Sequence, residues 1–257
     1  MDISLGAGIA GPDRPMTGTP AIAARGLGKD FGPLCALAAL DLEVSAGEFF
    51  ALLGPNGAGK TTAVHLFATL LHPTRGGARV LGHDVVQEGL AVRRGIGLVF
   101  QEPTLDRDLS VVENMRFAAR LWDIPPRLAG SRTTELLDRF GLAAQRDVPV
   151  RALSGGQRRS ADIARGLLAE PRVLFLDEPT AGLDPHARRA LWETIHRLRG
   201  ERDVTVFLTT HYIEEAESCD RVALLAQGRL AALGTPAELK RRAGTTTLED
   251  ALLVTKL

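Results

Sequence analysis

The sequence predicts an α/β fold with a mostly parallel sheet at its core. Apolar runs typical of buried strands alternate with segments of helical periodicity, which favours a parallel sheet with helices on both faces. One strand passes through a glycine-rich turn directly into a helix, and another ends in two carboxylates. Ligands bind such sheets at the carboxyl ends of the strands, so both features lie where a functional site is expected.

Composition fits a large globular protein and indicates no highly charged partner. The 257 residues are 45% hydrophobic and 24% charged, and Lys+Arg and Asp+Glu both number 31. This balance gives no reason to expect nucleic acid or an acidic membrane surface as a partner. Cys35 and Cys219 lie far apart, which favours neither a disulfide framework nor a zinc site and fits a reducing cytosol. The chain shows no signal-peptide pattern and no apolar run near the roughly 20 residues that span a bilayer, so we expect a cytoplasmic protein.

In chain order, residues 1–20 are rich in Gly and Pro without periodicity, and we expect a disordered tail there. Helical periodicity from 110 to about 144, broken at Ile124-Pro125-Pro126, predicts a helical insertion into the α/β core. Strands are predicted at 21–25, 40–44, 49–53, 78–81, 94–100, 173–176, 204–208 and 222–225. Further helices are predicted at 63–68, near 187–199 and at 213–218.

The glycine-rich turn, residues 54–62, matches the pattern G-x-x-x-x-G-K-[ST] in the strand-to-helix context that this pattern requires. Glycines let successive backbone N–H groups turn inward as an anion nest, and the helix N-terminus adds its own donors. Lys60 would supply charge for the β- and γ-phosphates of a nucleotide, and the Thr61 hydroxyl would be a ligand for Mg²⁺. The alternative is a turn of purely structural use. The candidate nucleotide-binding residues of this phosphate loop are Gly54, Pro55, Asn56, Gly57, Ala58, Gly59, Lys60, Thr61 and Thr62.

The acidic strand end is the second candidate. Four apolar residues, 173–176, precede Asp177 and Glu178. Asp177 would hold Mg²⁺, directly or through water, and Glu178 would orient or deprotonate an attacking water. Two acidic residues that merely cap the following segment are the alternative.

The third candidate is residues 153–157. Ser154 and Gln157 form a capping box, which by itself only starts a helix. A capping box does not explain Gly155 and Gly156, because two glycines in a first turn cost helix stability. Paired glycines at a capped N-terminus leave an exposed anion-binding surface, so Ser154, Gly155, Gly156 and Gln157 could grip a second phosphate group.

Together these motifs resemble those of the ATP-binding subunits of ABC transporters, from about residue 21 to the C-terminus. Residues 54–62 match the phosphate loop of that family, 153–157 its signature motif, and 173–178 its metal-binding strand with the catalytic glutamate. The resemblance implies a P-loop NTPase with a mostly parallel core sheet and an N-terminal antiparallel β subdomain. It also implies an α-helical subdomain of about 102–165, inserted in an ATP-binding domain of 21–245, and a C-terminal tail segment of 246–257.

Four more residues take roles from the resemblance. Gln101 matches the glutamine that touches Mg²⁺ and senses the γ-phosphate, and His211 the switch histidine that contacts the γ-phosphate, although a structural histidine would fit too. Phe31 stands where the family stacks an aromatic on adenine, more often tyrosine, and an ordinary packed aromatic is the alternative. Asp184 matches the loop that crosses the dimer interface, and it also precedes Pro185 as a helix N-cap would. The implied catalytic residues are Glu178, His211 and Gln101, and the implied metal ligands are Thr61, Gln101 and Asp177.

The implied function is ATP hydrolysis, with Mg²⁺, that powers transport through separate membrane-spanning permease subunits. The resemblance also implies ATP-dependent pairing with a second ATP-binding subunit, in a homodimer or a heterodimer, at the cytoplasmic face of the membrane. Residues 99–106, 210–217 and 247–250 resemble the drug- and antibiotic-exporting branch and its nodulation-factor relatives, which favours export. Residues 160–162 depart from relatives, which often carry a basic or bulky residue there. A soluble ABC-type ATPase in cofactor assembly, translation or DNA maintenance is the alternative.

Overall fold

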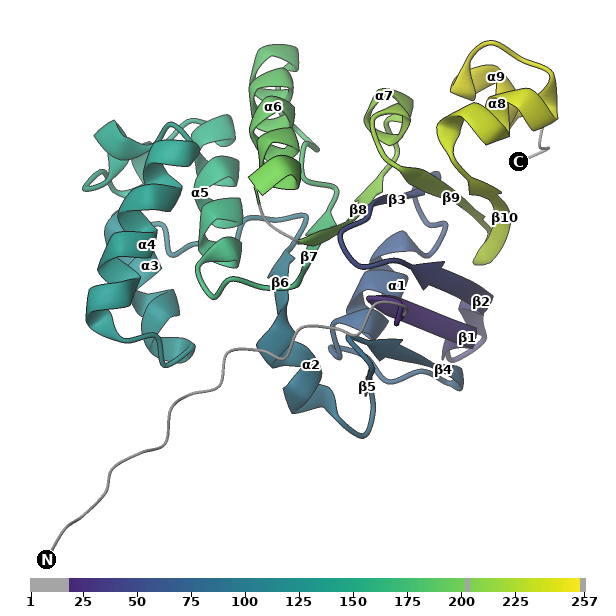
Figure 1. Ribbon diagram of the computed structural model, residues 1–257, viewed down its shortest axis with the longest axis horizontal. Helices are drawn as coiled ribbons and strands as arrows, with labels where there is room; N and C mark the ends of the chain where they lie inside the picture. The colour runs from purple at the N-terminus through teal and green to yellow at the C-terminus, as the bar shows by residue number, and fades with distance from the viewer. Residues whose placement is uncertain (1–18, 202–203, 255–257) are drawn as a thin grey trace, which may run out of the picture.

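The computed structural model describes residues 19–201 and 204–254. Over these residues one ten-stranded mixed sheet runs in the order β5-β4-β1-β2-β10-β9-β3-β8-β7-β6 (Figure 1). The strands are β1 (Ile22–Phe31), β2 (Leu34–Val44), β3 (Phe49–Leu53), β4 (Arg75–Val80), β5 (His83–Asp84), β6 (Ile96–Val99), β7 (Val173–Asp177), β8 (Thr205–Thr210), β9 (Arg221–Ala226) and β10 (Arg229–Gly234). The helices are α1 (Lys60–Phe67), α2 (Gly89–Gly95), α3 (Val111–Leu121), α4 (Pro126–Arg139), α5 (Gly155–Leu167), α6 (Pro185–Glu201), α7 (Ile213–Glu217), α8 (Pro236–Ala243) and α9 (Leu248–Val254), with 3-10 turns η1 (Ala143–Gln145) and η2 (Val150–Ala152).

The centre of the sheet is parallel, and its strands end in line. β3 pairs with β8, β8 with β7 and β7 with β6, with Leu53 opposite Thr210 and Asp177 opposite Thr209. Every side chain of β3, β7 and β8 is buried, because helices cover both faces, and this explains their nearly continuous apolar sequences. The segments that follow these three strands therefore leave the sheet at the same edge.

Alternate residues of β3 serve two separate cores. Phe49 and Leu53 belong to the core on one face of the sheet, and Phe50 to the core on the other, as the two-residue period of a strand requires. Phe50 stacks on Phe207 of β8 at 5.4 Å between ring centroids, and Phe67 of α1 meets the same ring edge-on at 5.6 Å. This aromatic cluster holds α1 against the sheet and so fixes both ends of the turn between β3 and α1.

The N-terminal part of the sheet is antiparallel, which confirms the expected β subdomain. β1 pairs with β2 and β4, and β4 with β5, all antiparallel. β2 joins the rest of the sheet by a parallel pairing of Ala39 with Arg229 of β10. This places the β1–β2 hairpin beside the start of α1.

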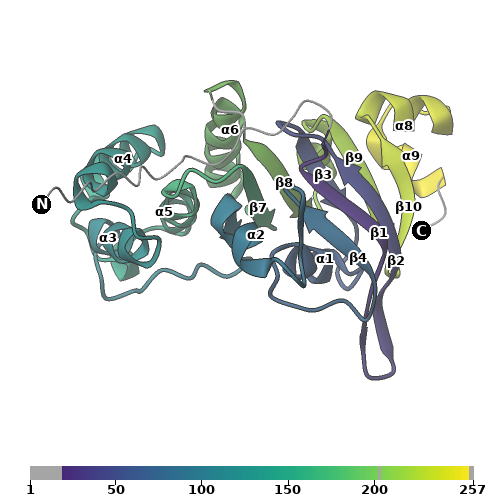
Figure 2. The same cartoon turned by 60° about the horizontal axis from the view of Figure 1, so that its bottom comes forward.

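The predicted helical insertion is present beyond β6. Ser110 caps α3 in a capping box with Glu113, and Pro126 is the first residue of α4, so the break expected at 124–126 separates two helices. Together with α5 they lie beside the β6 end of the sheet (Figure 2). Across the described residues, no helix is long and apolar enough to cross a bilayer.

The structure differs from the sequence-based expectations in several elements. The pattern predicts none of α2, α8, α9, β5 and β10, and β1 and β2 are longer than the strands expected at 21–25 and 40–44. The strand expected at 94–100 begins only at Ile96, because Arg94 and Gly95 complete helix α2. Near the C-terminus the chain forms α9, which packs on α8 and α7 with Leu248 and Ala251 buried. The N-terminal tail expected at 1–20 lies, up to residue 18, outside the described residues.

Candidate functional site

The phosphate loop connects β3 to α1, and its glycines are required by close backbone contacts. A Cβ at Gly54 would lie 2.3 Å from the carbonyl oxygen of Leu225, and one at Gly59 would lie 2.4 Å from that of Ala36. Gly57 and Gly59 also have φ of 80° and 102°, where side chains are disfavoured. Gly59 is the N-cap of α1, so the first backbone N–H groups of that helix face the loop. The turn is therefore shaped as the sequence pattern predicts.

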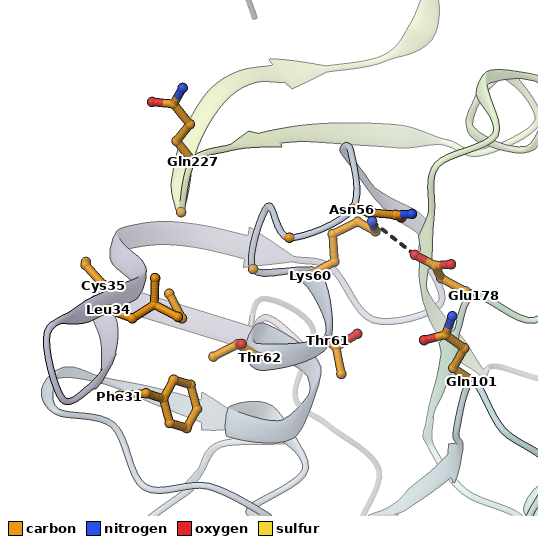
Figure 3. Close-up of a pocket in the computed structure, with 14 residues that line it drawn as sticks. Phe31, Leu34, Cys35, Asn56, Lys60, Thr61, Thr62, Gln101, Glu178 and Gln227 are labelled. Atoms are coloured by element: carbon orange, nitrogen blue, oxygen red, sulfur yellow. Dashed lines mark ion pairs between the residues drawn. The ribbon is translucent and has the colours of Figure 1, made fainter.

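Lys60 lies inside the loop with its side chain 4% exposed. Its Nζ donates to the carbonyl oxygens of Gly54 at 2.8 Å and Pro55 at 3.1 Å. The same ammonium forms an ion pair with Glu178 Oε1 at 3.0 Å (Figure 3). A charge this deeply buried needs such partners, and any phosphate that entered the loop would compete with the Glu178 carboxylate for it.

Glu178 follows β7 in an unusual backbone conformation. Its φ is 45°, in the left-handed region, and its N–H donates to both the carbonyl (3.2 Å) and the hydroxyl (3.0 Å) of Thr209 on β8. His211, which follows β8, places Nδ1 3.1 Å from Glu178 Oε2. Strain of this kind, about 1–3 kcal/mol, persists where neighbouring contacts hold it and is common at functional sites. The carboxylate therefore joins Lys60 and His211.

Oxygen atoms suited to binding Mg²⁺ lie beside the Glu178 carboxylate. The Thr61 hydroxyl donates to Asp177 Oδ1 at 3.2 Å, and the Thr209 hydroxyl donates to the same oxygen. Gln101, which lies just beyond the end of β6, lines one cavity together with Thr61 and Glu178. Mg²⁺ is commonly held by one or two protein oxygens together with substrate phosphates, so this donor set fits it. In the part of the chain that the structure describes, no three His, Cys, Asp or Glu side chains cluster as a metal site of their own.

Lys60, Thr61, Gln101 and Glu178 line one cavity of about 610 Å³ (Figure 3). Asp177 and His211 are outside this lining and contact it through Thr61 and Glu178. Phe31 lies at the far end from Glu178, with its ring 46% exposed and the Lys29 ammonium 5.3 Å from the ring centroid. The full lining is Phe31, Leu34, Cys35, Ala36, Asn56, Gly57, Gly59, Lys60, Thr61, Thr62, Gln101, Glu178, Gln227 and Gly228. The exposed aromatic ring at one end and the buried charges at the other match the two ends of a nucleotide.

Two parts of this lining are absent from the sequence-based prediction. Leu34, Cys35 and Ala36 come from the start of β2, and nothing in their local sequence marks them. Gln227 and Gly228 form the β9–β10 turn with φ of 48° and 72°, so Gln-Gly between two apolar runs was a readable hairpin signal. Its position was not readable from the sequence. Gly228 N donates to the Ala58 carbonyl at 3.0 Å, and Ala38 N donates to the Gly228 carbonyl at 2.8 Å, which fastens the turn to the loop and to β2.

Residues 153–157 and Asp184 do not reach this cavity. The capping box is present: Ser154 Oγ accepts from Gln157 N at 3.2 Å, and Gln157 Oε1 accepts from Ser154 N at 3.0 Å. A Cβ at Gly156 would lie only 3.0 Å from that of Ala187, so this glycine lets α5 approach α6. Ser154, Gly155 and Asp184 are exposed at the N-terminal ends of the two helices.

Asp184 is the N-cap of α6 that the Asp-Pro pair predicts. Its Oδ1 accepts from the backbone N–H groups of Ala187 at 2.9 Å and His186 at 3.0 Å. These hydrogen bonds hold the pKa of the Asp184 carboxyl below its usual value, and the bond from Ala187 has the larger effect. The capping role does not exclude a role at an interface.

Comparison with known proteins identifies the relatives of this chain. The family model described as "ABC transporter" matches residues 37–181. The chain is 46% identical over 233 residues to the daunorubicin resistance ATP-binding protein DrrA3 of Streptomyces coeruleorubidus, covering 90% of this chain and 73% of that protein. It is 40% identical to the Nod factor export ATP-binding protein I of Ralstonia nicotianae, over 86% of this chain and 69% of that protein. Its fold matches cbiO1 of Clostridium perfringens, part of the ABC transporter complex cbiONQ, with a TM-score of 0.79 and 31% identity over 87% of this chain and 91% of that one.

Proposed function

The chain belongs to the ABC transporter family, whose ATP-binding subunits hydrolyse ATP to power transport, and we propose that this subunit drives export through separate membrane-spanning permease subunits. One observation carries the site assignment: Lys60, Glu178 and His211, far apart in sequence, meet beside a cavity with an exposed aromatic at its other end. Export is supported by relatives whose names describe drug resistance and Nod factor export. Those names describe no cofactor assembly, translation or DNA maintenance, so the soluble alternative is not favoured.

In the proposed complex, ATP lies along the cavity with its adenine on Phe31 and its phosphates in residues 54–62. Lys60 would leave Glu178 and bond the β- and γ-phosphates, while Thr61, Asp177 and Gln101 would hold Mg²⁺, which would supply positive charge beside the phosphates. Glu178, freed from Lys60, orients or deprotonates the attacking water, and His211 contacts the γ-phosphate.

We further propose that a second ATP-binding subunit completes the site. Ser154, Gly155, Gly156, Gln157 and Asp184 lie at two neighbouring helix N-termini, away from the cavity of their own chain. Backbone N–H groups at helix N-termini favour anions, and the γ-phosphate bound by a second copy, or by a related chain, is the anion that they would meet. Two ATP molecules would thus join two subunits head to tail, and hydrolysis would release them.

The link to the membrane is proposed to run through the helical subdomain of about 102–165 within the ATP-binding domain of 21–245. It is entered at Gln101 and left through α5, so its motion is tied to both nucleotide-facing segments. Residues 102–110 would contact the permease at the cytoplasmic face of the membrane. Opening and closing of the dimer would then favour different states of the permease by differential affinity.

A glutamine at position 178 tests the catalytic assignment. Glu178→Gln should retain ATP binding, lose most turnover and form an ATP-dependent dimer in size-exclusion chromatography. Adding Ser154→Arg should abolish that dimer while each monomer still binds ATP, because the new side chain blocks the α5 N-terminus. Full activity of Glu178→Gln would remove this carboxylate from its catalytic role. Normal dimerisation of the double variant would refute the role of residues 153–157 across the interface.

Export requires a second experiment with the permease. Co-expression with a membrane-spanning partner should retain the chain in the membrane fraction, and the reconstituted complex should show transport-linked ATPase activity. An ATPase that stays in the soluble fraction when its permease is present would contradict the transport assignment but leave ATP hydrolysis intact.

A further inference from the structure

Three charged residues on one face of α5 fasten that helix to residues 100–104, the glutamine loop. Arg159, Asp162 and Arg165 are spaced three apart, so their side chains share a face of the helix. Arg159 is 3% exposed; its Nη1 donates to the Phe100 carbonyl at 2.6 Å and its Nη2 to the Gln101 carbonyl. One guanidinium therefore holds both carbonyl groups where the chain leaves β6.

Arg165 holds the other end of the glutamine loop. Its Nη1 donates to the Thr104 carbonyl at 3.2 Å and its Nη2 to the Thr104 hydroxyl. The same Nη2 donates to Asp162 Oδ1 at 2.8 Å, while Arg159 Nη1 lies 4.0 Å from Asp162 Oδ2. Asp162 is thus the buried carboxyl group between two arginines, and burial raises its pKa while Arg165 and Arg159 act to lower it.

Burying the Arg159 guanidinium costs free energy, so its bonds to the two backbone carbonyls are unlike an ordinary packing contact. Burial lowers the pKa of Arg159, while the carboxylates of Asp162, Glu102 and Asp177, in that order, act to raise it. A planar guanidinium can bond two carbonyl groups at once, whereas the ammonium of a lysine is a compact point charge without that fork. A packing role alone would not require this group. The buried fork points to a need to fix the backbone of Gln101.

We propose that Arg159 is a positioning residue for Gln101, and that it makes α5 and the glutamine loop move as one unit. The inference rests on the proposed function, in which Gln101 holds Mg²⁺. The Gln101 amide faces the same cavity as Thr61 and Glu178 (Figure 3). Ser154, at the start of the same α5, belongs to the segment proposed to meet the nucleotide of the second subunit. Arg159 therefore connects two parts of the protein. One is α5, whose N-terminus would meet the nucleotide of the second subunit, and the other is Gln101, which would act at the nucleotide of its own subunit.

The test is the Mg²⁺ dependence of the ATPase in Arg159→Lys, which keeps the charge and loses the fork. We expect the Mg²⁺ concentration for half-maximal activity to rise about fivefold, the effect of losing roughly one hydrogen bond of positioning, with a lower kcat. ADP affinity in EDTA should stay within about twofold of wild type, because no metal is then involved. In a Gln101→Ala background, Arg159→Lys should raise the Mg²⁺ concentration for half-maximal activity by less than about a further twofold, because a residue that acts only through Gln101 then has no side chain to position.

Arg132→Lys is the matched control. Arg132 lies in α4 and also donates to a backbone carbonyl, that of Leu168 at 3.3 Å, but does not contact the glutamine loop. Its Mg²⁺ dependence should equal that of wild type. If Arg159→Lys melts below the assay temperature, Arg165→Lys, at the more exposed end of the same contact, should still raise the Mg²⁺ requirement by about twofold.

Several outcomes would overturn the inference. An unchanged Mg²⁺ requirement in Arg159→Lys, or an equal loss in the Gln101→Ala background, would show that Arg159 does not act through Gln101. A shift of equal size in Arg132→Lys would make the effect one of general loosening. Any of these three results, if the wild-type protein hydrolyses ATP normally, refutes the inference about Arg159 and leaves the proposed function intact. Failure of Gln101→Ala to change the Mg²⁺ requirement would remove both the inference and the proposed metal role of Gln101.

Discussion

The ion pair between Lys60 and Glu178 gives the sharpest quantitative prediction. Both side chains are buried, 4% and 8% exposed, and their charged atoms are 3.0 Å apart. Glu178→Gln keeps the size of the side chain and an oxygen that accepts a hydrogen bond, but removes the negative charge. The ammonium of Lys60 then stays buried with neutral acceptors alone, namely the Gly54 and Pro55 carbonyls and the amide oxygen at position 178. We expect the protein without nucleotide to lose stability.

The magnitude follows from the geometry. Coulomb attraction across 3.0 Å is about 5 kcal/mol at an effective dielectric constant near 20, much of it offset by desolvation. Loss of one partner of a buried pair costs about 3–5 kcal/mol. Because Lys60 keeps three hydrogen-bond acceptors in the variant, we expect about 2–3 kcal/mol. For a chain of this size that lowers the melting temperature by about 5–10 °C.

The assay is thermal unfolding with and without ATP. Phosphates would replace the missing carboxylate, so ATP should restore most of the lost stability and stabilise Glu178→Gln more than it stabilises wild type. Glu43→Gln is the control, because its ion pair with Arg25 is exposed and should contribute less than about 0.5 kcal/mol. Equal melting temperatures of Glu178→Gln and wild type without ATP, or equal shifts with it, would refute the competition between Glu178 and phosphate for Lys60.

Three further predictions concern the phosphate loop and a helix cap. Lys60→Ala should weaken ATP binding by about 10- to 100-fold, the value of a charge-assisted hydrogen bond, and unchanged affinity by calorimetry would refute the phosphate-loop assignment. Gly57→Ala should cost about 1–2 kcal/mol in urea unfolding through its positive φ alone, whereas Gly59→Ala, whose Cβ meets the Ala36 carbonyl, should cost clearly more; equal costs would contradict the close contact. The folded-state pKa of the Asp184 carboxyl is lowered, so its contribution to stability is present above about pH 3.8 and is lost as the pH falls through the folded-state pKa. Asp184→Asn still caps the helix, so it should lose less stability between pH 6 and pH 3 than the wild type does. Equal losses in the two proteins would count against the capping role of the Asp184 carboxylate.

Local sequence was sufficient wherever the signal was contiguous. The strand, glycines and helix around Lys60 predicted the loop because steric limits on φ and anion binding by backbone N–H groups act within a few residues. The box at Ser154 and the cap at Asp184 were readable for the same reason. The start of β6 was misplaced, since Arg94 and Gly95 fit a helix end and a strand equally well by pattern.

Sequence alone therefore determined the fold class, the phosphate loop and the carboxylates at the end of β7, whereas α2, α8, α9, β5 and β10 were not predicted. Tertiary structure decided which of these groups meet. The contact of Glu178 with Lys60 depends on the register of β3, β8 and β7, and the docking of Gly228 on Ala58 depends on where the β9–β10 turn falls in the sheet. The fork of Arg159 reaches Gln101 across 58 residues of chain. Such contacts are set by strand order and helix packing, which a pattern of neighbouring residues does not encode.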